Sequence, residues 1–278
     1  TIIDYVDGVQ DLDNAVIRMI GDPERRIHRD PVRMIRAIRH AARNNFRIEE
    51  QTWKAICENH QMLQHCPPSR LRDELLKDLY SGHAAAWLQS AIDSGIFLAL
   101  FPLYQKVFSR PPENRLHPQA HLVNLLRVLD RINRDTGVTR SGLLPDYFLL
   151  TLLLIPWVES RYHIFSQQFN GSSLFQVAKR IRDDIDREIG VQLNLRRSLR
   201  QEATSMLTNL SLLIQHRKNE SWPKWLRNKN YFSRTSLLYS CYMEATFDIP
   251  SLDDHSEFLP QVPEEPPQSP PDRDKHRR

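Results

Sequence analysis

Glycine is scarce in this sequence, with 8 among 278 residues, and cysteine is scarcer, with 3. Cys57, Cys66 and Cys241 lie far apart, so we expect neither a disulfide framework nor a cysteine zinc site, which is typical of a reducing cytosol. The longest apolar run, YFLLTLLLI between Pro145 and Pro156, is too short to cross a bilayer and predicts a buried helix. We therefore expect a cytoplasmic protein with no membrane partner.

Strand-like alternation of apolar and polar residues is also scarce. Most segments repeat apolar residues at three- and four-residue spacing, which predicts a nearly all-α fold. The exception is residues 1–21, where TIIDYV and AVIRMIG are short and β-branched and predict two edge strands around a turn or short helix. The apolar share of 40% is enough to bury one large core or two smaller ones.

The formal net charge is only +4, so a nucleic-acid partner would have to bind a local patch. The strongest patch, residues 25–47, contains a single acid, Asp30, among these arginines: Arg25, Arg26, Arg29, Arg33, Arg36, Arg39, Arg43 and Arg47. Asp30 followed by Pro31 predicts a helix over 31–45 with Asp30 as its N-cap. Its periodicity places Met34, Ile35, Ile38, Ala41 and Ala42 on one face and Arg36, Arg39 and Arg43 on the other.

Asp30 and Arg33 are three residues apart and therefore share a face of this helix. Together they offer an anionic acceptor and a forked cationic donor. Cytosine and adenine each present an amino donor beside a ring-nitrogen acceptor, which this pair matches, whereas uracil and guanine present the reverse order. Arg36 and Arg39 could then hold a triphosphate or an RNA backbone. From spacing alone, the alternative that Asp30 is only a cap on a solvated arginine face stays open.

A resemblance to a known family bears on this choice. The segment IIDYVDGVQDLDNAVIRMIGDPERRIHRDPVRMIRAIRHAARNNFRI resembles the sequence after the catalytic head of bacterial poly(A) polymerase I, which belongs with the class II tRNA nucleotidyltransferases, the CCA-adding enzymes. PPSRLRDELLKDLYSGHAAAWLQSAIDSGIFLALFP resembles the neck motif of the same family, and LRRSLRQ and NKNYFSRTSLLY are weaker matches to its body. The resemblance is specific over residues 2–102 and looser over 119–247.

The resemblance implies an all-α architecture of helical neck and body domains, with a short β and hinge remnant of the head at the N-terminus. Residues 1–25 would form the hinge segment, 26–110 the neck and 119–250 the body. Residues 251–278 are rich in proline and charge, and we expect them to form a disordered tail.

The function that the resemblance implies is template-independent addition of AMP from ATP to RNA 3′ ends, with RNA and ATP as partners and no DNA. The head's magnesium-binding carboxylates are not found in this sequence, so we assign no catalytic and no metal residue and expect Mg²⁺ only with a head. By itself the chain is expected to bind RNA weakly and not to polymerise. Two alternatives stay open: a CCA-adding enzyme that uses CTP and ATP, and a non-catalytic RNA-binding relative.

Residue by residue, the resemblance implies that Asp30 and Arg33 read the incoming base and that Arg36 faces the substrate. RNA contacts are expected from Arg39, Arg43, Arg196, Arg197 and Arg200. The positions that match the hinge are Asp4, Asp11, Leu12, Arg18 and Gly21. Arg70, Glu74 and Lys77 match the neck motif and predict one salt-bridged helix face.

The sequence departs from the family at Arg29, where a glutamate is usual, and this puts selection between ATP and CTP in question. Asp7 and Ala15 stand where glycine is frequent. Three other patterns predict structure more than chemistry: His117 with His121 as a helix start, Asp183 with Asp184 as a salt-bridged surface, and Trp225 with Phe232 as core.

Overall fold

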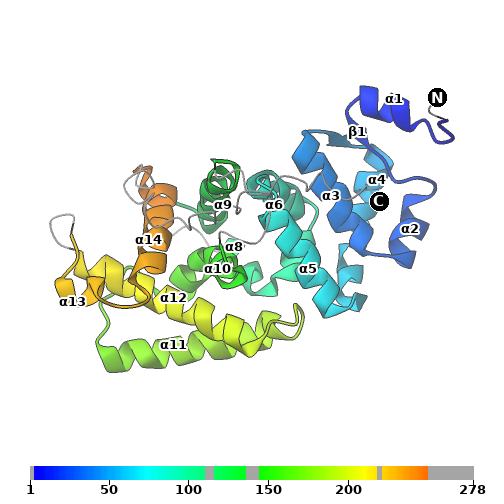
Figure 1. Cartoon of the computed structure of the whole chain (residues 1–278). Coiled ribbons are helices and arrows are strands. Elements are labelled where there is room, and N and C mark those ends of the chain that lie inside the picture. The colour runs from blue at the N-terminus through cyan, green and yellow to red at the C-terminus, as the bar shows by residue number, and fades with distance from the viewer. Residues whose placement is uncertain (1–2, 110–115, 136–143, 218–220, 250–278) are drawn as a thin grey trace, which may run out of the picture.

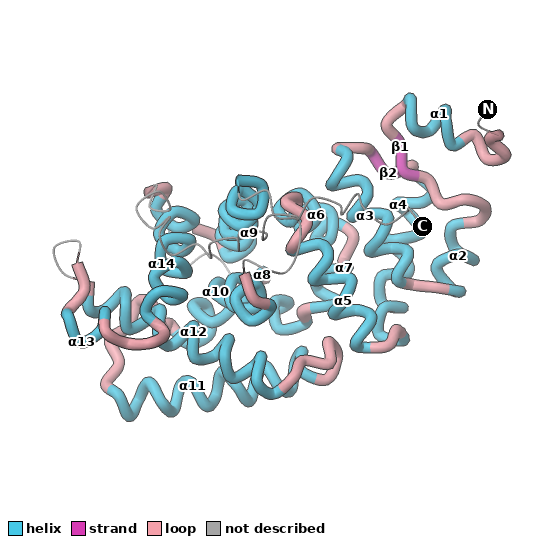
Figure 2. The backbone as a smooth tube through the Cα atoms, in the orientation of Figure 1, coloured by secondary structure: helices cyan, strands magenta, loops and turns pink. Residues whose placement is uncertain are grey.

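The computed structural model describes residues 3–109, 116–135, 144–217 and 221–249. Within these ranges the only strands are β1 (Val16–Ile17) and β2 (Arg47–Ile48), which pair in parallel near the N-terminus (Figure 2). The all-α prediction is confirmed. Within the same ranges, no helix combines the length and the apolar character that crossing a bilayer requires. The predicted tail, 251–278, lies outside the described residues. So does most of the segment between the predicted neck and body, 111–118.

The prediction of two N-terminal strands around a turn or short helix is confirmed for the second strand and for the helix between them. Val16–Ile17 is a strand, which pairs with Arg47–Ile48, whereas residues 3–6 form no strand. The Asp4 carboxylate accepts hydrogen bonds from the backbone N–H groups of Val6 (3.0 Å) and Val9 (2.8 Å). These bonds turn the chain into α1 (Gly8–Asp13), because an aspartate that bonds nearby backbone competes with strand pairing.

The first helical block, which we call the neck, contains short helices that extend from the N-terminal end of the molecule to its middle, where the last of them lie beside helices of the second block (Figure 1). They are α2 (Pro23–Arg29), α3 (Val32–Asn44), α4 (Glu50–Asn59), η1 (His60–His65), α5 (Pro68–Leu79), α6 (Ala84–Asp93), α7 (Ile96–Leu100), η2 (Pro102–Tyr104) and α8 (Gln105–Phe108). α2 begins at a sequence-encoded signal, since the Asp22 side chain accepts from Arg25 N–H (2.8 Å) and Pro23 follows it.

The structure confirms a helix in the arginine segment but corrects its start. α3 begins at Val32, and the Asp30 side chain makes no capping bond to it; Pro31 occupies the N-cap position. The Asp30 backbone carbonyl instead accepts from Arg33 N–H (3.1 Å). The predicted apolar face is confirmed, with Met34, Ile35 and Ile38 fully buried.

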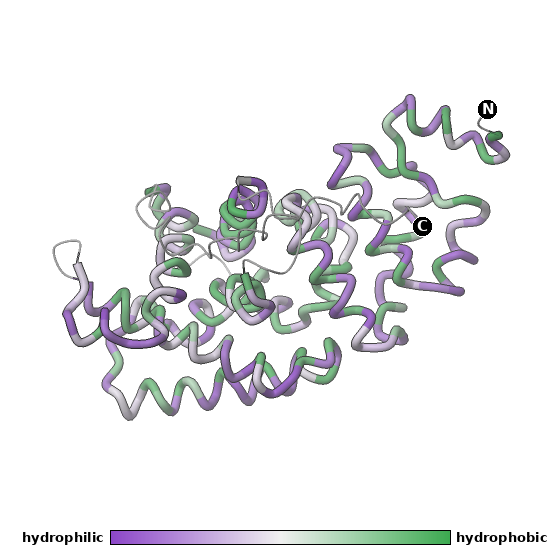
Figure 3. Tube along the Cα trace, in the orientation of Figure 1, coloured by the Kyte–Doolittle hydropathy of each residue, from purple (hydrophilic) through white to green (hydrophobic). Residues whose placement is uncertain are grey.

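The second block, which we call the body, contains longer helices. They are α9 (Pro118–Asp135), α10 (Asp146–Tyr162), α11 (Gly171–Ile185), η3 (Asp186–Gly190), α12 (Arg197–His216), α13 (Lys224–Arg227) and α14 (Phe232–Phe247). α10 packs against α9 and α12, and every residue from Phe148 to Val158 is buried, as the apolar run predicted. On α11, hydrophilic and hydrophobic segments alternate, as on a helix with one face exposed (Figure 3).

One continuous cluster of buried apolar side chains joins the neck to the body. α6 is the connecting element, since it packs on α3 in the neck and on α9 in the body. Asp130 of α9 caps α6, accepting from the N–H groups of Ala84 (2.6 Å) and Ala85 (2.9 Å). A carboxylate at a helix N-terminus also interacts favourably with the helix dipole. The neck is therefore held rigidly on the body.

Candidate nucleotide-binding site

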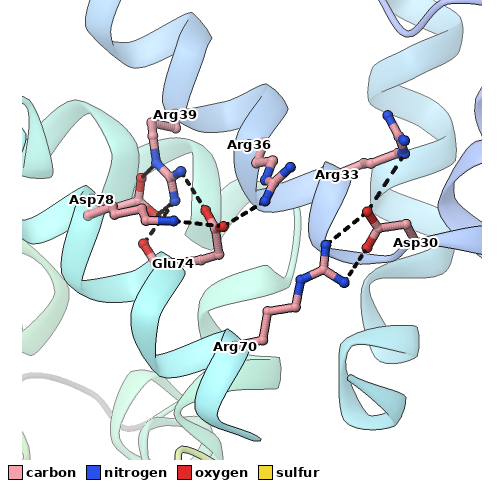
Figure 4. A network of polar contacts seen from close by, with 8 residues as sticks. Asp30, Arg33, Arg36, Arg39, Arg70, Glu74 and Asp78 are labelled. Atoms are coloured by element: carbon pink, nitrogen blue, oxygen red, sulfur yellow. Dashed lines mark hydrogen bonds and ion pairs between the residues drawn. The ribbon is translucent and has the colours of Figure 1, made fainter. Parts of the chain in front are cut away.

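Asp30, predicted to read a base, lies at the junction of α2 and α3 and faces the first turn of α5. Arg70 of α5 binds it in a bidentate ion pair, with Nη1 at 3.0 Å from Oδ1 and Nη2 at 3.0 Å from Oδ2 (Figure 4). Arg33 lies on the other side, its Nε 3.9 Å from Asp30 Oδ2. The helix spacing thus brought Asp30 and Arg33 together, while Arg70, 40 residues away in sequence, is a partner that the spacing did not predict.

Arg36 and Arg39, one and two turns further along α3, both contact Glu74 of α5. Arg36 Nη2 is 2.9 Å from Glu74 Oε1, and Arg39 Nη1 is 2.5 Å from Oε2. Arg39 also pairs with Asp78, Nε to Oδ1 at 2.5 Å, and donates to the Glu74 carbonyl at 2.8 Å. Arg39 is only 7% exposed and Asp78 is 0% exposed. The predicted placement of Arg39 on a polar outer face is wrong: this guanidinium is part of a buried ionic network.

The two carboxylates of this network have shifted pKa values in opposite directions. Burial opposes ionisation of Glu74, but hydrogen bonds from Arg36, Arg39 and Lys77 outweigh it and lower the pKa of Glu74 to about 2. Burial raises the pKa of Asp78 to about 7, although Arg39 acts against that rise. Glu74 is therefore the anion that holds α3 against α5.

The predicted salt-bridged face on α5 is only partly present. Lys77 Nζ lies 3.1 Å from Glu74 Oε1, as the spacing indicates. Arg70, however, pairs with Asp30 across to α3 rather than with Glu74 along its own helix. The neck motif therefore connects two segments, because Arg70 pairs with Asp30 just before α3 and Glu74 pairs with Arg36 and Arg39 on α3, whereas Lys77 pairs with Glu74 on its own helix.

The other predicted arginines differ in their exposure and in whether they form an ion pair. Arg43 is exposed and only reaches the Lys77 carbonyl at 3.4 Å, while Arg196 and Arg197 are exposed at the start of α12. Arg200 is paired with Asp186 at 2.8 Å. The loop before α12 touches α5, since Arg72 Nη1 donates to the Asn194 carbonyl at 3.1 Å. The body arginines therefore lie on the side of the body that meets the helix bearing Arg70.

The hinge segment has two residues other than glycine in the left-handed conformation. Asp7 (φ 58°) and Ala15 (φ 54°) both adopt the left-handed conformation, as does Gly21 (φ 79°). Asp11 and Arg18 hold the segment together through an ion pair of 2.9 Å. The two departures from the family pattern therefore leave the hinge conformation available at a cost in backbone strain.

Three patterns predicted to be structural have mixed outcomes. His121 is buried, with Nε2 3.0 Å from Thr246 Oγ1, and burial lowers its pKa to about 4. Asp184 pairs with Arg161 (2.8 Å) and with Arg187, which confirms the salt-bridged surface. Phe232 is buried as predicted, but Trp225 is 50% exposed, so its placement in the core was wrong. In the described part of the chain, no cluster of His, Cys, Asp and Glu could hold a metal ion.

Comparison with known sequence families gives one match. Residues 45–107 match the family described as "Probable RNA and SrmB- binding site of polymerase A". This segment runs from the end of α3 to α8 and includes Arg70 and Glu74, but it ends before the body.

Two curated relatives illustrate the sequence similarity. Poly(A) polymerase I of Salmonella typhi is 36% identical over 154 residues, which cover 55% of this chain and 33% of the relative. The CCA-adding enzyme of Lactobacillus gasseri is 37% identical over 206 residues, covering 62% of this chain and 51% of the relative. The chain thus spans about a third to a half of the length of the curated relatives it matches.

Solved structures share the fold. The CCA-adding enzyme of Bacillus stearothermophilus in complex with CTP has a TM-score of 0.56 at 19% identity, covering 92% of this chain and 52% of that one. An apo form of a CCA-adding enzyme reaches 0.58 at 21% identity, with the same coverage. The likeness to these structures shows a shared fold.

Proposed function

We propose that this chain is the base-selecting and RNA-binding part of an RNA nucleotidyltransferase of the group that includes poly(A) polymerase I and the CCA-adding enzymes, which its sequence similarity to these proteins supports. We propose further that the enzyme adds AMP from ATP to RNA 3′ ends without a template. The observation that carries the proposal is the geometry at the start of α3. There a carboxylate and a guanidinium lie side by side, Asp30 and Arg33, on a surface that a ligand can reach.

The pair supplies the hydrogen-bonding pattern that adenine requires. Asp30 accepts from the exocyclic amino group, and Arg33 donates to the neighbouring ring nitrogen. Guanine would place a carbonyl against the carboxylate and an N–H against the guanidinium, which leaves buried polar groups unpaired. Arg36, exposed one turn further along α3, is directed to the phosphates of the same nucleotide.

Arg70 compensates for the replacement of the usual glutamate by Arg29. Arg29 is exposed at the end of α2, and no ion pair of its side chain is found among the described residues. The bidentate contact from Arg70 fixes the plane of the Asp30 carboxylate. Oδ1 is buried beside Arg70, so Oδ2, which Arg33 also approaches, is the oxygen that we assign to the base. Selection of adenine through Asp30 therefore does not need an acid at position 29.

The RNA contacts that we propose are the exposed arginines, Arg43, Arg196 and Arg197. Arg200 can contribute only if it leaves Asp186. Arg39 is omitted, because its guanidinium already donates to Glu74 and Asp78 in the interior. A phosphate would have to break that network to reach it, which would leave buried Asp78 without its ionic partner and Glu74 with only Arg36 and Lys77.

The described residues do not fit the Mg²⁺ that phosphoryl transfer in this family implies. The nearest candidate, Asp183 with Asp184, fails because Asp184 is already paired with Arg161 and Arg187 and accepts from the Tyr162 hydroxyl. We therefore assign no metal-dependent step to this chain. Residues 1–278 alone are expected to show no magnesium-dependent AMP addition, and detectable incorporation would contradict this.

The second candidate is a CCA-adding activity. Cytosine presents the same donor and acceptor order as adenine, so the Asp30–Arg33 pair suits CTP as well, and CCA-adding enzymes are among the relatives. Titrations of the chain with ATP, CTP, GTP and UTP separate the candidates. A preference for ATP supports the poly(A) activity, and equal affinity for ATP and CTP supports the CCA-adding activity.

The controls for this titration are substitutions in the pair. Asp30→Ala and Arg33→Ala are expected to abolish the preference, whereas Arg25→Ala, on an exposed neighbouring arginine, is expected to preserve it. Equal binding of all four nucleotides, unchanged by Asp30→Ala, would sink the base-reading proposal and leave an RNA-binding relative of the family.

A further inference from the structure

A hollow lies beside the Asp30–Arg33 pair, and Arg33 but not Asp30 lines it. Its volume is about 330 Å³, and it is formed by the segment after β1, by α2 and by α3. Arg33 belongs to both places, because its side chain approaches Asp30 and also lines the hollow. The other charged or titratable residues of the lining are Arg18, Arg26, Arg36 and His40, and the rest of the lining is apolar.

The lining carries positive charge without a carboxylate of its own. Arg18 and Arg36 have acidic partners outside the hollow, Asp11 and Glu74. Arg26 donates from Nε to the Ile20 carbonyl (2.9 Å), and among the described residues it has no ion pair. Arg33 has only the 3.9 Å contact with Asp30, which Arg70 holds more closely. The guanidinium groups of Arg26 and Arg33 therefore have no close carboxylate of their own, and both can interact with an anionic ligand.

His40, which also lines the hollow, lies in the same positive potential. Burial, and then the charges of Arg39, Arg43 and Arg36, lower the pKa of His40. A neutral imidazole retains one N–H donor for a phosphate oxygen. Arg33 and His40 are seven residues apart on α3, about 10 Å along the helix axis. That length suits a chain of two or three phosphates.

The wall of the hollow is held in place before any ligand arrives. Met19 N–H donates to Thr52 Oγ1 of α4 at 3.2 Å, which ties the segment after β1 to the neck. Gly21, with φ 79°, turns this segment towards α2, where the Arg26 guanidinium lies against it. Because the donors are ordered in advance, binding an anion costs little reorganisation.

We propose that this hollow is a phosphate-binding subsite, in which Arg26 and His40, together with Arg36, bind the phosphate groups of a nucleotide whose base lies at Asp30 and Arg33. The ligand chemistry is phosphate, either the triphosphate of a free nucleotide or the backbone of an RNA 3′ end. The identity of the ligand rests on the proposed function, but the site itself does not. The apolar lining residues, Ile17, Met19, Ile20 and Ala37, can contact a ribose, and the cationic residues can contact the phosphates.

The test measures binding of tripolyphosphate, ATP, GTP and a short oligoadenylate to the 278-residue chain by calorimetry. Arg26→Ala is expected to weaken tripolyphosphate, ATP and GTP by the same factor, about tenfold for one lost charge-assisted contact. Arg25→Ala is the matched control, since Arg25 is the neighbouring exposed arginine on α2 and does not line the hollow. Added salt is expected to weaken the wild type more than Arg26→Ala.

A second variant guards against a folding defect. Arg26→Gln keeps a donor for the Ile20 carbonyl but removes the charge, so it is expected to lose phosphate affinity with an unchanged thermal unfolding temperature. Weakening of oligoadenylate but not of tripolyphosphate by this variant supports the subsite and identifies RNA as the source of the phosphate. Equal effects of the Arg25 and Arg26 substitutions, or no effect of either, overturn the proposal.

The same titrations separate this inference from the base-reading proposal. Asp30→Ala is expected to change the ratio of ATP to GTP affinity while tripolyphosphate binding stays constant. Arg26→Ala is expected to lower all three affinities while the ratio stays constant. Loss of the ratio alone and loss of phosphate affinity alone are therefore distinct results.

Discussion

The neck and the body of this protein are held together by different chemistry. Between α3 and α5 the neck buries Arg39 with Glu74 and Asp78, and it half-buries Asp30 with Arg70. The body surrounds α10, whose buried face is wholly apolar apart from Thr151, and its main ionic cluster, around Asp184, involves exposed arginines. The neck thus buries a guanidinium between two carboxylates, at a cost in desolvation, whereas the guanidinium groups of the Asp184 cluster stay in solvent.

The largest expected effect comes from removing the buried guanidinium of the neck. Arg39→Met leaves Glu74 and Asp78 without their shared partner, so we expect a loss of about 3–5 kcal/mol in the free energy of unfolding, measured in urea. The body control is Arg187→Met. Little change is expected, because the Arg187 guanidinium is exposed and Asp184 keeps its ion pair with Arg161. Similar losses in both variants would remove the distinction between the two regions.

The next effect is a pH dependence located in the body. His121 has a folded pKa of about 4, below its ordinary value of 6.5, so its stability contribution is complete above pH 6.5. As the pH falls from 6.5 towards 4, the unfolded chain binds a proton that the folded chain does not, and stability falls by up to about 3 kcal/mol.

The measurement for His121 is the difference in unfolding free energy between the wild type and His121→Gln across this pH range. Taking the difference removes the contribution of Asp78 in the neck, whose raised pKa acts in the opposite direction because it reduces stability as the pH rises. A difference that does not change between pH 7 and pH 4 would mean that His121 is accessible to protons in the folded protein.

A smaller effect concerns recognition in the neck. Arg70→Ala frees the Asp30 carboxylate to rotate, and we expect the preference for ATP over GTP to fall about tenfold, as for the loss of one charged hydrogen bond. Arg70→Lys is expected to be intermediate, because an ammonium cannot form the bidentate contact. Arg72→Ala, on the same helix, is the control and should keep the preference; its failure to do so would assign the effect to helix packing.

The smallest effect tests the strained hinge. Ala15→Gly relieves a left-handed alanine and is expected to stabilise the chain by about 1 kcal/mol in thermal unfolding. Ala86→Gly, the same substitution on the exposed face of α6, is expected to destabilise by a similar amount, about 1 kcal/mol. Changes of the same sign at both positions would contradict the role assigned to the Ala15 backbone.

Prediction from sequence succeeded where neighbours along the chain decide the structure. The buried α10 and the apolar face of α3 follow from periodicity, because a helix places residues three and four apart on one side. It did not identify the partner of β1, which is 31 residues ahead (Val16 with Arg47), and it was wrong for Trp225, since no local pattern shows whether another element covers that side chain.

The candidate site divides in the same way. The sequence alone determined that arginines recur along α3, because the geometry of one helix fixes this relation. It also placed Arg33 near Asp30, which lies just before the helix. Only the tertiary structure decided which arginine is available. Packing of α5 against α3 assigns Arg39 to buried carboxylates and Arg70 to Asp30, and it leaves Arg33 and Arg36 exposed. The physical reason is that the strength of an interaction between two charges depends on their distance and on their burial. Both are set by residues that are far apart in the sequence.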